Sequence, residues 1–103
     1  MNTERIASIR TVNPTTNQVE KVFDEMSLEQ IESIISKADK AFKSWRHTSI
    51  SERAKIIHKV ASIMHDRKEV LGRLATLEMG KLLTEAIGEV ELCVGIFNYY
   101  ADH

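Results

Sequence analysis

The chain has 103 residues, of which 43% are hydrophobic and 28% are charged, a composition typical of a folded domain rather than a disordered segment. Its formal net charge of -1 provides no basic excess, so we expect binding neither to nucleic acid nor to an anionic membrane surface. With a single cysteine and no apolar run near the amino terminus long enough for a signal peptide or a membrane span, we expect a reduced, cytoplasmic protein.

The amino-terminal segment, residues 1–26, predicts an extended hairpin that turns at Pro14. Proline fixes its own φ and keeps Asn13 out of the helical region. The three residues after it, "TTN", have side chains that stabilise turns. Because an isolated hairpin of this size is marginally stable, we expect it to lie against another part of the protein. The apolar residues of its strands are Ile9, Val12, Val19 and Val22.

From residue 27 onward the apolar residues follow a helical period, and two serines predict where the first two helices begin. Ser27 and Gln30 have the capping-box spacing, in which each side chain binds a backbone N–H of the other residue. Ser49 and Glu52 repeat that spacing. We expect these helices to end near positions 47 and 67. The apolar stripe of the first comprises Leu28, Ile31, Ile34, Ile35, Ala38, Ala41, Phe42 and Trp45.

The rest of the chain predicts two more helices separated by Gly80. Glycine readily adopts the left-handed conformation that ends a helix, so we expect the third helix to stop at Gly80. The fourth should run from about Lys81 to Asp102. It is apolar over more than one stripe, because a second set of apolar residues flanks its main face, and such a helix needs neighbours on several sides. That flanking set is Leu82, Leu92, Cys93 and Ile96.

The segment "LEMGKLLTEAIGEVELC" contains the two features that most resemble functional motifs, a Gly-Lys pair and the single cysteine. The Gly-Lys pair lacks the remainder of a phosphate-binding loop, because Ala75 stands where the first glycine is needed and Leu82 where a serine or threonine is needed. Cys93 has no histidine or lysine within one turn to favour the thiolate, so we expect it to be a small buried hydrophobe. The four histidines show no zinc-ligand spacing and should lie at the surface.

Five segments, taken together, resemble the opening of the aldehyde dehydrogenase superfamily in order and spacing. They are "TVNPTTNQV", "ADKAFKSWR", "SERAKIIHKVASIM", "LATLEMGKLLTEAIGEVE" and "FNYYADH". The match covers nearly the whole chain from about Ile9, and the residues in these segments are most similar to those of succinate-semialdehyde dehydrogenases. The resemblance implies a mainly α fragment, a hairpin plus about four helices, of an α/β aldehyde dehydrogenase-like fold. Residues 1–103 would then be one incomplete domain, part of the cofactor-binding domain, with a hairpin over 1–26 and helices over 27–103.

The resemblance also implies a chemistry. Family members oxidise an aldehyde to a carboxylic acid with NAD or NADP, through attack of a cysteine thiolate on the aldehyde. The nucleophile, the water-activating glutamate and the cofactor-binding glycine segment come later in family members than His103, and Cys93 does not match the nucleophile. We therefore expect no catalytic residue and no cofactor site in these 103 residues, and no activity without the rest of an enzyme.

Two sets of residues match family positions with a structural or binding role. Thr11 and Val12, through main-chain carbonyls, and Glu78 match positions that hold a structural monovalent cation in some members, an ion that oxygen ligands suit. Leu92 and Ile96 match a segment that borders the substrate tunnel, although core packing is the commoner explanation for any one such residue.

Two kinds of partner remain open at this stage. The resemblance implies the remainder of a dehydrogenase chain as the partner. The alternative, which rests on the apolar flank of the fourth helix alone, is a freestanding helical interaction module that associates with itself or with another protein.

Overall fold

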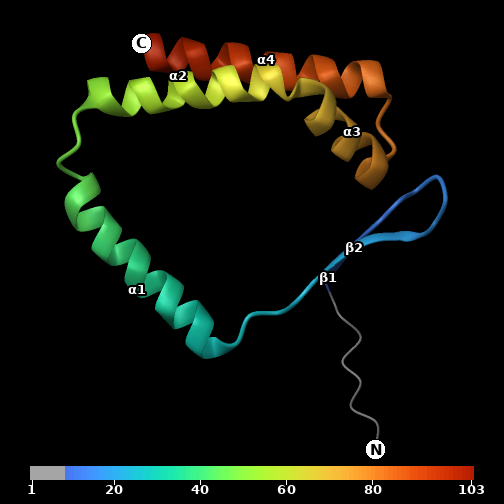
Figure 1. The fold of residues 1–103 in the computed structure, drawn as a ribbon, viewed down its shortest axis with the longest axis horizontal. Coiled ribbons are helices and arrows are strands. Elements are labelled where there is room, and N and C mark those ends of the chain that lie inside the picture. The colour runs from blue at the N-terminus through green and yellow to red at the C-terminus, as the bar shows by residue number, and fades with distance from the viewer. Residues whose placement is uncertain (1–8) are drawn as a thin grey trace, which may run out of the picture.

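The computed structural model describes residues 9–103, which form a two-stranded hairpin followed by four helices (Figure 1). The strands are β1 (Ile9–Val12) and β2 (Val19–Phe23). The helices are α1 (Leu28–Trp45), α2 (Ile50–Asp66), α3 (Lys68–Met79) and α4 (Leu83–Asp102). The expected hairpin and four helices are thereby confirmed, while the part of the expected extended segment before Ile9 lies outside the described residues. Within 9–103, no helix is long and apolar enough to cross a membrane.

The hairpin is antiparallel and turns where the sequence predicted. Asn13 organises the turn: its backbone N–H donates to the carbonyl of Gln18 at 2.9 Å, and its side-chain Oδ1 accepts from the N–H of Thr15 at 2.9 Å. The strand register shifts between Thr11 and Val12, as it does at a β-bulge, so the regular ladder is interrupted there.

Side-chain caps begin α1 and α2 at the predicted serines. The Ser27 hydroxyl accepts from the N–H of Gln30 at 3.2 Å, and the Gln30 side chain accepts from the N–H of Ser27 at 2.9 Å, a complete capping box. The Ser49 hydroxyl accepts from the N–H of Glu52 at 3.1 Å. These bonds satisfy backbone donors that a helix start leaves unpaired.

The helices α2, α3 and α4 pack together, and α2 lies alongside α4 in the opposite direction (Figure 1). Small residues form the tightest contacts: Ala61 and Ala86 are the buried apolar residues of the described chain, at 0% and 1% exposure. Gly72 of α3 is also buried, against Ile87 of α4. A seam lined by small side chains lets two helix backbones approach closely, at the cost of a thin core.

Gly80 ends α3 as predicted, in the left-handed conformation with φ 72°. Its N–H donates to the carbonyl of Thr76 at 2.9 Å. The residue also meets the hairpin, because a Cβ added to Gly80 would lie 3.0 Å from Cγ of Pro14. The helix stop therefore brings the hairpin turn against the end of α3, and α4 starts two residues later than Lys81, at Leu83.

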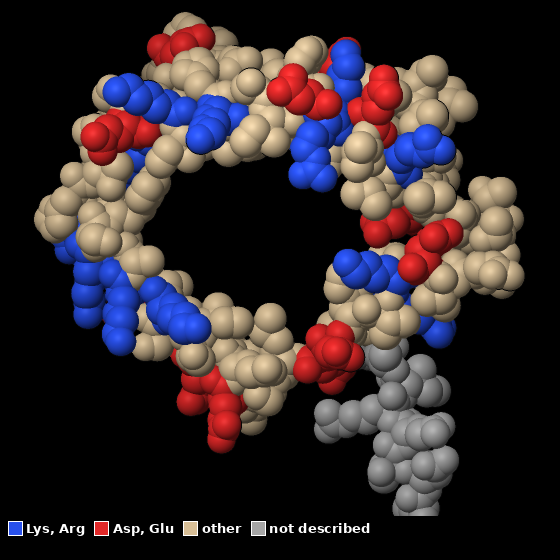
Figure 2. All heavy atoms as spheres, in the orientation of Figure 1, with Lys and Arg blue, Asp and Glu red and all other residues tan. Residues whose placement is uncertain are grey.

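The outline is that of an open ring rather than a ball. Figure 2 shows the chain surrounding an unfilled centre, with α1 set apart from the packed helices. The extents are 56 × 41 × 16 Å and the radius of gyration is 18.6 Å, whereas a compact domain of this length has a radius of about 13 Å. No residue of α1 is buried. The predicted apolar stripe of α1 is therefore present but uncovered.

Candidate functional site

The Gly-Lys segment has none of the geometry of a phosphate loop. The N–H of Gly80 is used within the end of α3, and Nζ of Lys81 lies 2.6 Å from Oε1 of Glu89. Both groups that could meet a phosphate are therefore engaged inside the protein. The interpretation of Gly80 as a helix stop and of Lys81 as a salt-bridged residue agrees with this arrangement.

Cys93 is exposed, so the expectation that it is buried was wrong. It lies beside an open, apolar hollow of about 440 Å³ between α2, α3 and α4, together with Met64, Leu71 and Val90. Among the residues that line this hollow, the one charged side chain is Glu89, which is paired with Lys81. The flank of α4 that carries Cys93 is uncovered in 9–103, which explains both the exposure and the failed expectation.

Leu92 and Ile96, the residues matched to a tunnel border, are 63% and 44% exposed. Each lies at a different hollow: Leu92 beside Cys93, and Ile96 in a second apolar hollow of about 380 Å³ with Ile57 and Tyr100. The structure therefore does not bring them to a single site. Within the described residues both side chains are uncovered, so a tunnel border and packing against a part outside 9–103 both remain predictions.

The three residues matched to a cation site lie where the hairpin meets α3. Thr11 and Val12 are half-buried at the bulge of β1, and β1 packs against α3. Glu78 is exposed in the last turn of α3, two residues before the contact between Gly80 and Pro14. Oγ1 of Thr11 is buried without a hydrogen-bond partner. That oxygen is a hydroxyl, whereas the expected cation ligands are the main-chain carbonyls of Thr11 and Val12, and 9–103 contains no group of three or more His, Cys, Asp or Glu that could hold a metal.

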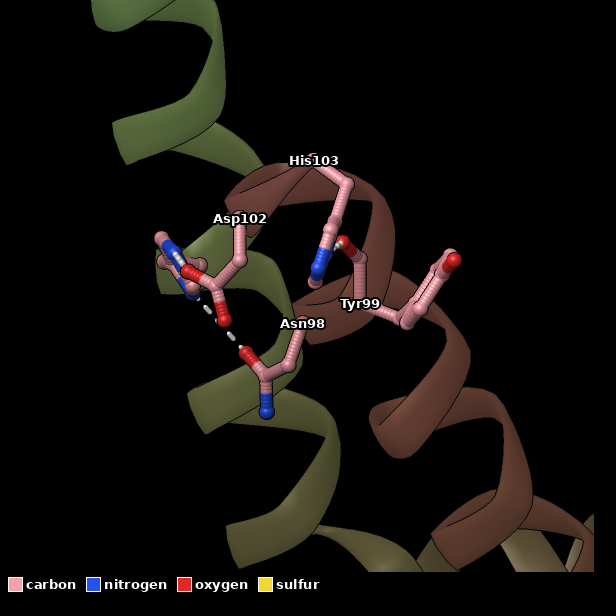
Figure 3. A network of polar contacts seen from close by, with 5 residues as sticks. Asn98, Tyr99, Asp102 and His103 are labelled. Carbon is pink, nitrogen blue, oxygen red and sulfur yellow. Dashed lines mark hydrogen bonds and ion pairs between the residues drawn. The ribbon is translucent and has the colours of Figure 1, made fainter.

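The best-defined polar constellation joins α2 to the end of α4, and the sequence did not predict it. Nδ1 of His58 lies 2.9 Å from Oδ1 of Asn98, and Nε2 of His58 lies 2.8 Å from Oδ1 of Asp102. Figure 3 shows Asn98 and Asp102 one turn apart on α4, both pointing toward α2. Their four-residue spacing predicts that Asn98 and Asp102 share one face of the helix, but only the fold shows that this face lies against His58. The oxygen of Asn98, followed by the charge of Asp102, raises the pKa of His58 above 6.5.

A second cross-link joins the start of α3 to the middle of α4. Nζ of Lys68 donates to Oε1 of Glu91 at 2.7 Å. The hydrogen bond and the opposite charge raise the pKa of Lys68 and lower that of Glu91. Both cross-links therefore act at the α4 surface, one toward α2 and one toward α3, and neither is arranged around a reacting atom.

Comparison with known proteins identifies relatives along the whole chain. The aldehyde dehydrogenase family model matches residues 1–103. A succinate-semialdehyde dehydrogenase [NADP(+)] of Deinococcus radiodurans is 44% identical over 89% of this chain and 19% of its own. A probable succinate-semialdehyde dehydrogenase [NADP(+)] of Synechocystis is 35% identical over 92% of this chain and 21% of its own.

Solved structures agree with the sequence relatives. The succinic semialdehyde dehydrogenase of Streptococcus pyogenes, in complex with NADP+, superposes with a TM-score of 0.84 at 38% identity and covers 90% of this chain and 21% of its own. Betaine aldehyde dehydrogenase of Staphylococcus aureus, in complex with NAD+, gives a TM-score of 0.83 at 29% identity over 91% of this chain. The chain thus spans about a fifth of the length of these relatives. On the match of the family model to its full length and on this agreement of fold, the chain belongs to the aldehyde dehydrogenase family.

Proposed function

We propose that these residues are the amino-terminal part of an NAD(P)-dependent aldehyde dehydrogenase that oxidises an aldehyde, succinic semialdehyde being the first candidate, to the carboxylic acid. The observation that carries the proposal is the 44% identity to a succinate-semialdehyde dehydrogenase [NADP(+)]. The structure in complex with NADP+ and the one in complex with NAD+ belong to relatives, and between them they leave both cofactors as candidates for the parent enzyme.

The described residues by themselves are proposed to be catalytically inactive and to bind no cofactor. Cys93 is the thiol of the chain, and the hollow beside it is apolar apart from Glu89, whose carboxylate is paired with Lys81. The polar constellation at His58 has no nucleophile beside it in the described part of the chain. In this proposal the cofactor, the nucleophile and the activating base are supplied by the parts of the enzyme that correspond to the other four fifths of its relatives.

The partner that we propose is that remaining part of the dehydrogenase, and α1 is one surface that it would cover. Leu28, Ile35 and Phe42 on α1 are 80%, 62% and 56% exposed. Each large apolar side chain that is covered contributes about 1.5–3 kcal/mol, so covering α1 would greatly stabilise a chain with so thin a core. The open shape of the described residues supports the proposal that they are an incomplete domain.

The two sets of matched residues keep proposed roles in the parent enzyme. Thr11 and Val12, through their main-chain carbonyls, and Glu78 would help to hold a structural sodium or potassium ion, which the position of the β1 bulge against α3 supports. Leu92 and Ile96 would border the substrate tunnel, which their exposure supports.

A second candidate function is a freestanding helical module that associates through α4. The exposed apolar residues of α4 favour it, with Leu92 63% and Tyr100 72% exposed. Light scattering of the purified chain separates this candidate from the first: a defined oligomer without any catalytic complementation would favour the module.

The test of the first candidate is a complementation assay. The purified chain is incubated with succinic semialdehyde and NADP+ or NAD+, alone and after co-expression with the Deinococcus radiodurans relative shortened by the segment that this chain matches. We expect reduced cofactor to accumulate only in the co-expressed sample. Steady turnover by the chain alone would contradict the proposed inactivity, and a folded but inactive pair would contradict the proposed partner.

A matched pair of variants on α1 tests the docking surface in the same assay. Ile35→Glu places a charge on the exposed apolar stripe, whereas Ser36→Glu places it on the neighbouring, exposed polar position. We expect the first to abolish complementation and the second to retain it, because only the first buries a charge at the proposed interface.

A further inference from the structure

The His58 constellation is unusual in that both ring nitrogens face an oxygen atom. Oδ1 of Asp102 is 2.8 Å from Nε2, and Oδ1 of Asn98 is 2.9 Å from Nδ1. A carboxylate oxygen only accepts hydrogen bonds, so Nε2 must carry a proton. If Nδ1 is bare, its lone pair then points at the carbonyl oxygen of Asn98. With the amide of Asn98 in this orientation, both contacts are favourable together only when both ring nitrogens are protonated and the ring carries a positive charge.

Asn98 makes this arrangement reversible. Rotation of its amide by half a turn would present Nδ2–H to a bare Nδ1, an orientation that an aspartate at the same place could not provide. The charge attraction to Asp102 is lost on deprotonation in either orientation. The contact between α2 and α4 is therefore strongest in the doubly protonated state.

Few other charges surround His58. On α2 the nearest are Lys55 and Lys59, both exposed. On α4 the next titratable group after Asp102 is His103, whose Nδ1 lies 2.8 Å from the carbonyl oxygen of Tyr99. The third packed helix, α3, begins ten residues beyond His58, about 15 Å along the helix axis, and its first charged side chain is engaged with Glu91. Asp102 is thus the anion that pairs with the protonated ring of His58.

We propose that His58 is a proton-dependent latch that fastens the last turn of α4 to α2 when its ring is doubly protonated and loosens it when the ring loses a proton. This latch lies at the far end of the α2–α4 seam from the cross-link between Lys68 and Glu91. Its release would loosen the end of α4 from α2 and leave the link between α3 and α4 in place. The second apolar hollow, lined by Ile57, Ile96 and Tyr100, lies beside the latch and would change shape with it.

The direction of the pH effect follows from the contacts. His58 has its pKa raised above 6.5 in the folded chain, because Asn98 and Asp102 favour the protonated ring. The stabilisation is therefore fully present below that ordinary value and is lost as the pH rises through the folded pKa. With side chains 42% and 61% exposed at His58 and Asp102, salt should weaken the charge attraction but not the directed hydrogen bonds.

The test measures the ring and the helix end separately in the purified 103-residue chain. NMR of the imidazole signals from about pH 5 to 8 gives the titration midpoint of His58. Hydrogen exchange of the last turn of α4, corrected for the intrinsic rate at each pH, gives its opening. We expect a midpoint above 6.5 and a loss of protection in the last turn of α4 across that midpoint.

Four variants make the outcome decisive. Asp102→Asn should return the midpoint toward the ordinary value, and Asn98→Asp, a fixed acceptor, should raise it further and sharpen the loss of protection. His58→Arg, a permanent charge, should remove the pH dependence of protection, whereas His65→Gln, on an exposed residue two turns along α2, should leave it unchanged. A midpoint at or below 6.5 in the parent chain, an unchanged midpoint in Asp102→Asn, or a chain without helical signal would each overturn the proposal.

Discussion

Gly72 is the position where the structure makes its strongest demand on residue type. A Cβ added there would lie 2.8 Å from Cγ1 of Ile87, 3.1 Å from its backbone nitrogen and 3.3 Å from its Cα. Carbon atoms in contact are about 3.5–4.0 Å apart, so the overlap is severe. A side-chain rotation could move Cγ1, but the backbone atoms yield only if α3 and α4 separate.

The expected effect of Gly72→Ala is a net destabilisation. Overpacking a close helix contact costs about 1–3 kcal/mol. We expect the upper half of that range, because the backbone atoms of Ile87 cannot rotate away from the added methyl group. Alanine recovers about 1 kcal/mol of helix propensity relative to glycine. The net loss should be about 1–2 kcal/mol, which lowers the thermal midpoint of a domain of this size by roughly 4–16 °C, as measured by circular dichroism.

Gly88→Ala provides the matched control, because Gly88 is exposed on α4 and a Cβ there meets nothing within 4 Å. That substitution should raise the midpoint through helix propensity alone. Ile87→Ala removes Cγ1, so Gly72→Ala should cost less in that background than in the parent chain. The packing argument fails if Gly72→Ala raises the midpoint as Gly88→Ala does.

Three further predictions concern the pH, the ions and the helix start. Lys68 lowers the pKa of Glu91 from 4.5. The stability that this pair contributes is therefore present above pH 4.5 and is lost as the pH falls through the folded pKa. Glu91→Gln should flatten the acid side of a plot of thermal midpoint against pH. In the full-length parent enzyme, replacing sodium and potassium by choline at constant ionic strength should lower the thermal midpoint, and an equal effect in its Glu78→Gln variant would refute the cation role. Ser27→Ala should remove about 1 kcal/mol from α1, visible as lost helical ellipticity, while an unchanged spectrum would show that the cap contributes nothing.

The sequence predicted the features of the fold that depend on neighbouring residues. Ser27 and Gln30 cap α1 because their spacing is fixed by the first helical turn. Gly80 stops α3 because glycine adopts φ 72° without a steric cost. Such local signals survive even in a chain with little core. Where such a signal is missing, the prediction is less accurate. The start of α4 was predicted two residues before Leu83, because no side-chain cap marks it.

Burial and contacts across the fold could not be predicted in the same way. An apolar stripe shows that a helix has a face to cover, but not whether the cover lies within the same 103 residues. The stripe of α1 and the flank of α4 around Cys93 are both uncovered here. Likewise His58 and Asp102 are far apart in the sequence, and their contact depends on α2 and α4 lying antiparallel in one register.

The Gly-Lys segment shows how the two kinds of information combine. Sequence alone explains Gly80 by its backbone conformation. The structure adds a second requirement, because Cγ of Pro14 occupies the space into which a side chain at Gly80 would project. A residue such as asparagine, which tolerates a positive φ, would satisfy the first requirement and fail the second. The glycine therefore fixes where α3 ends and also holds the hairpin, with Thr11 at its bulge, against the turn that carries Glu78.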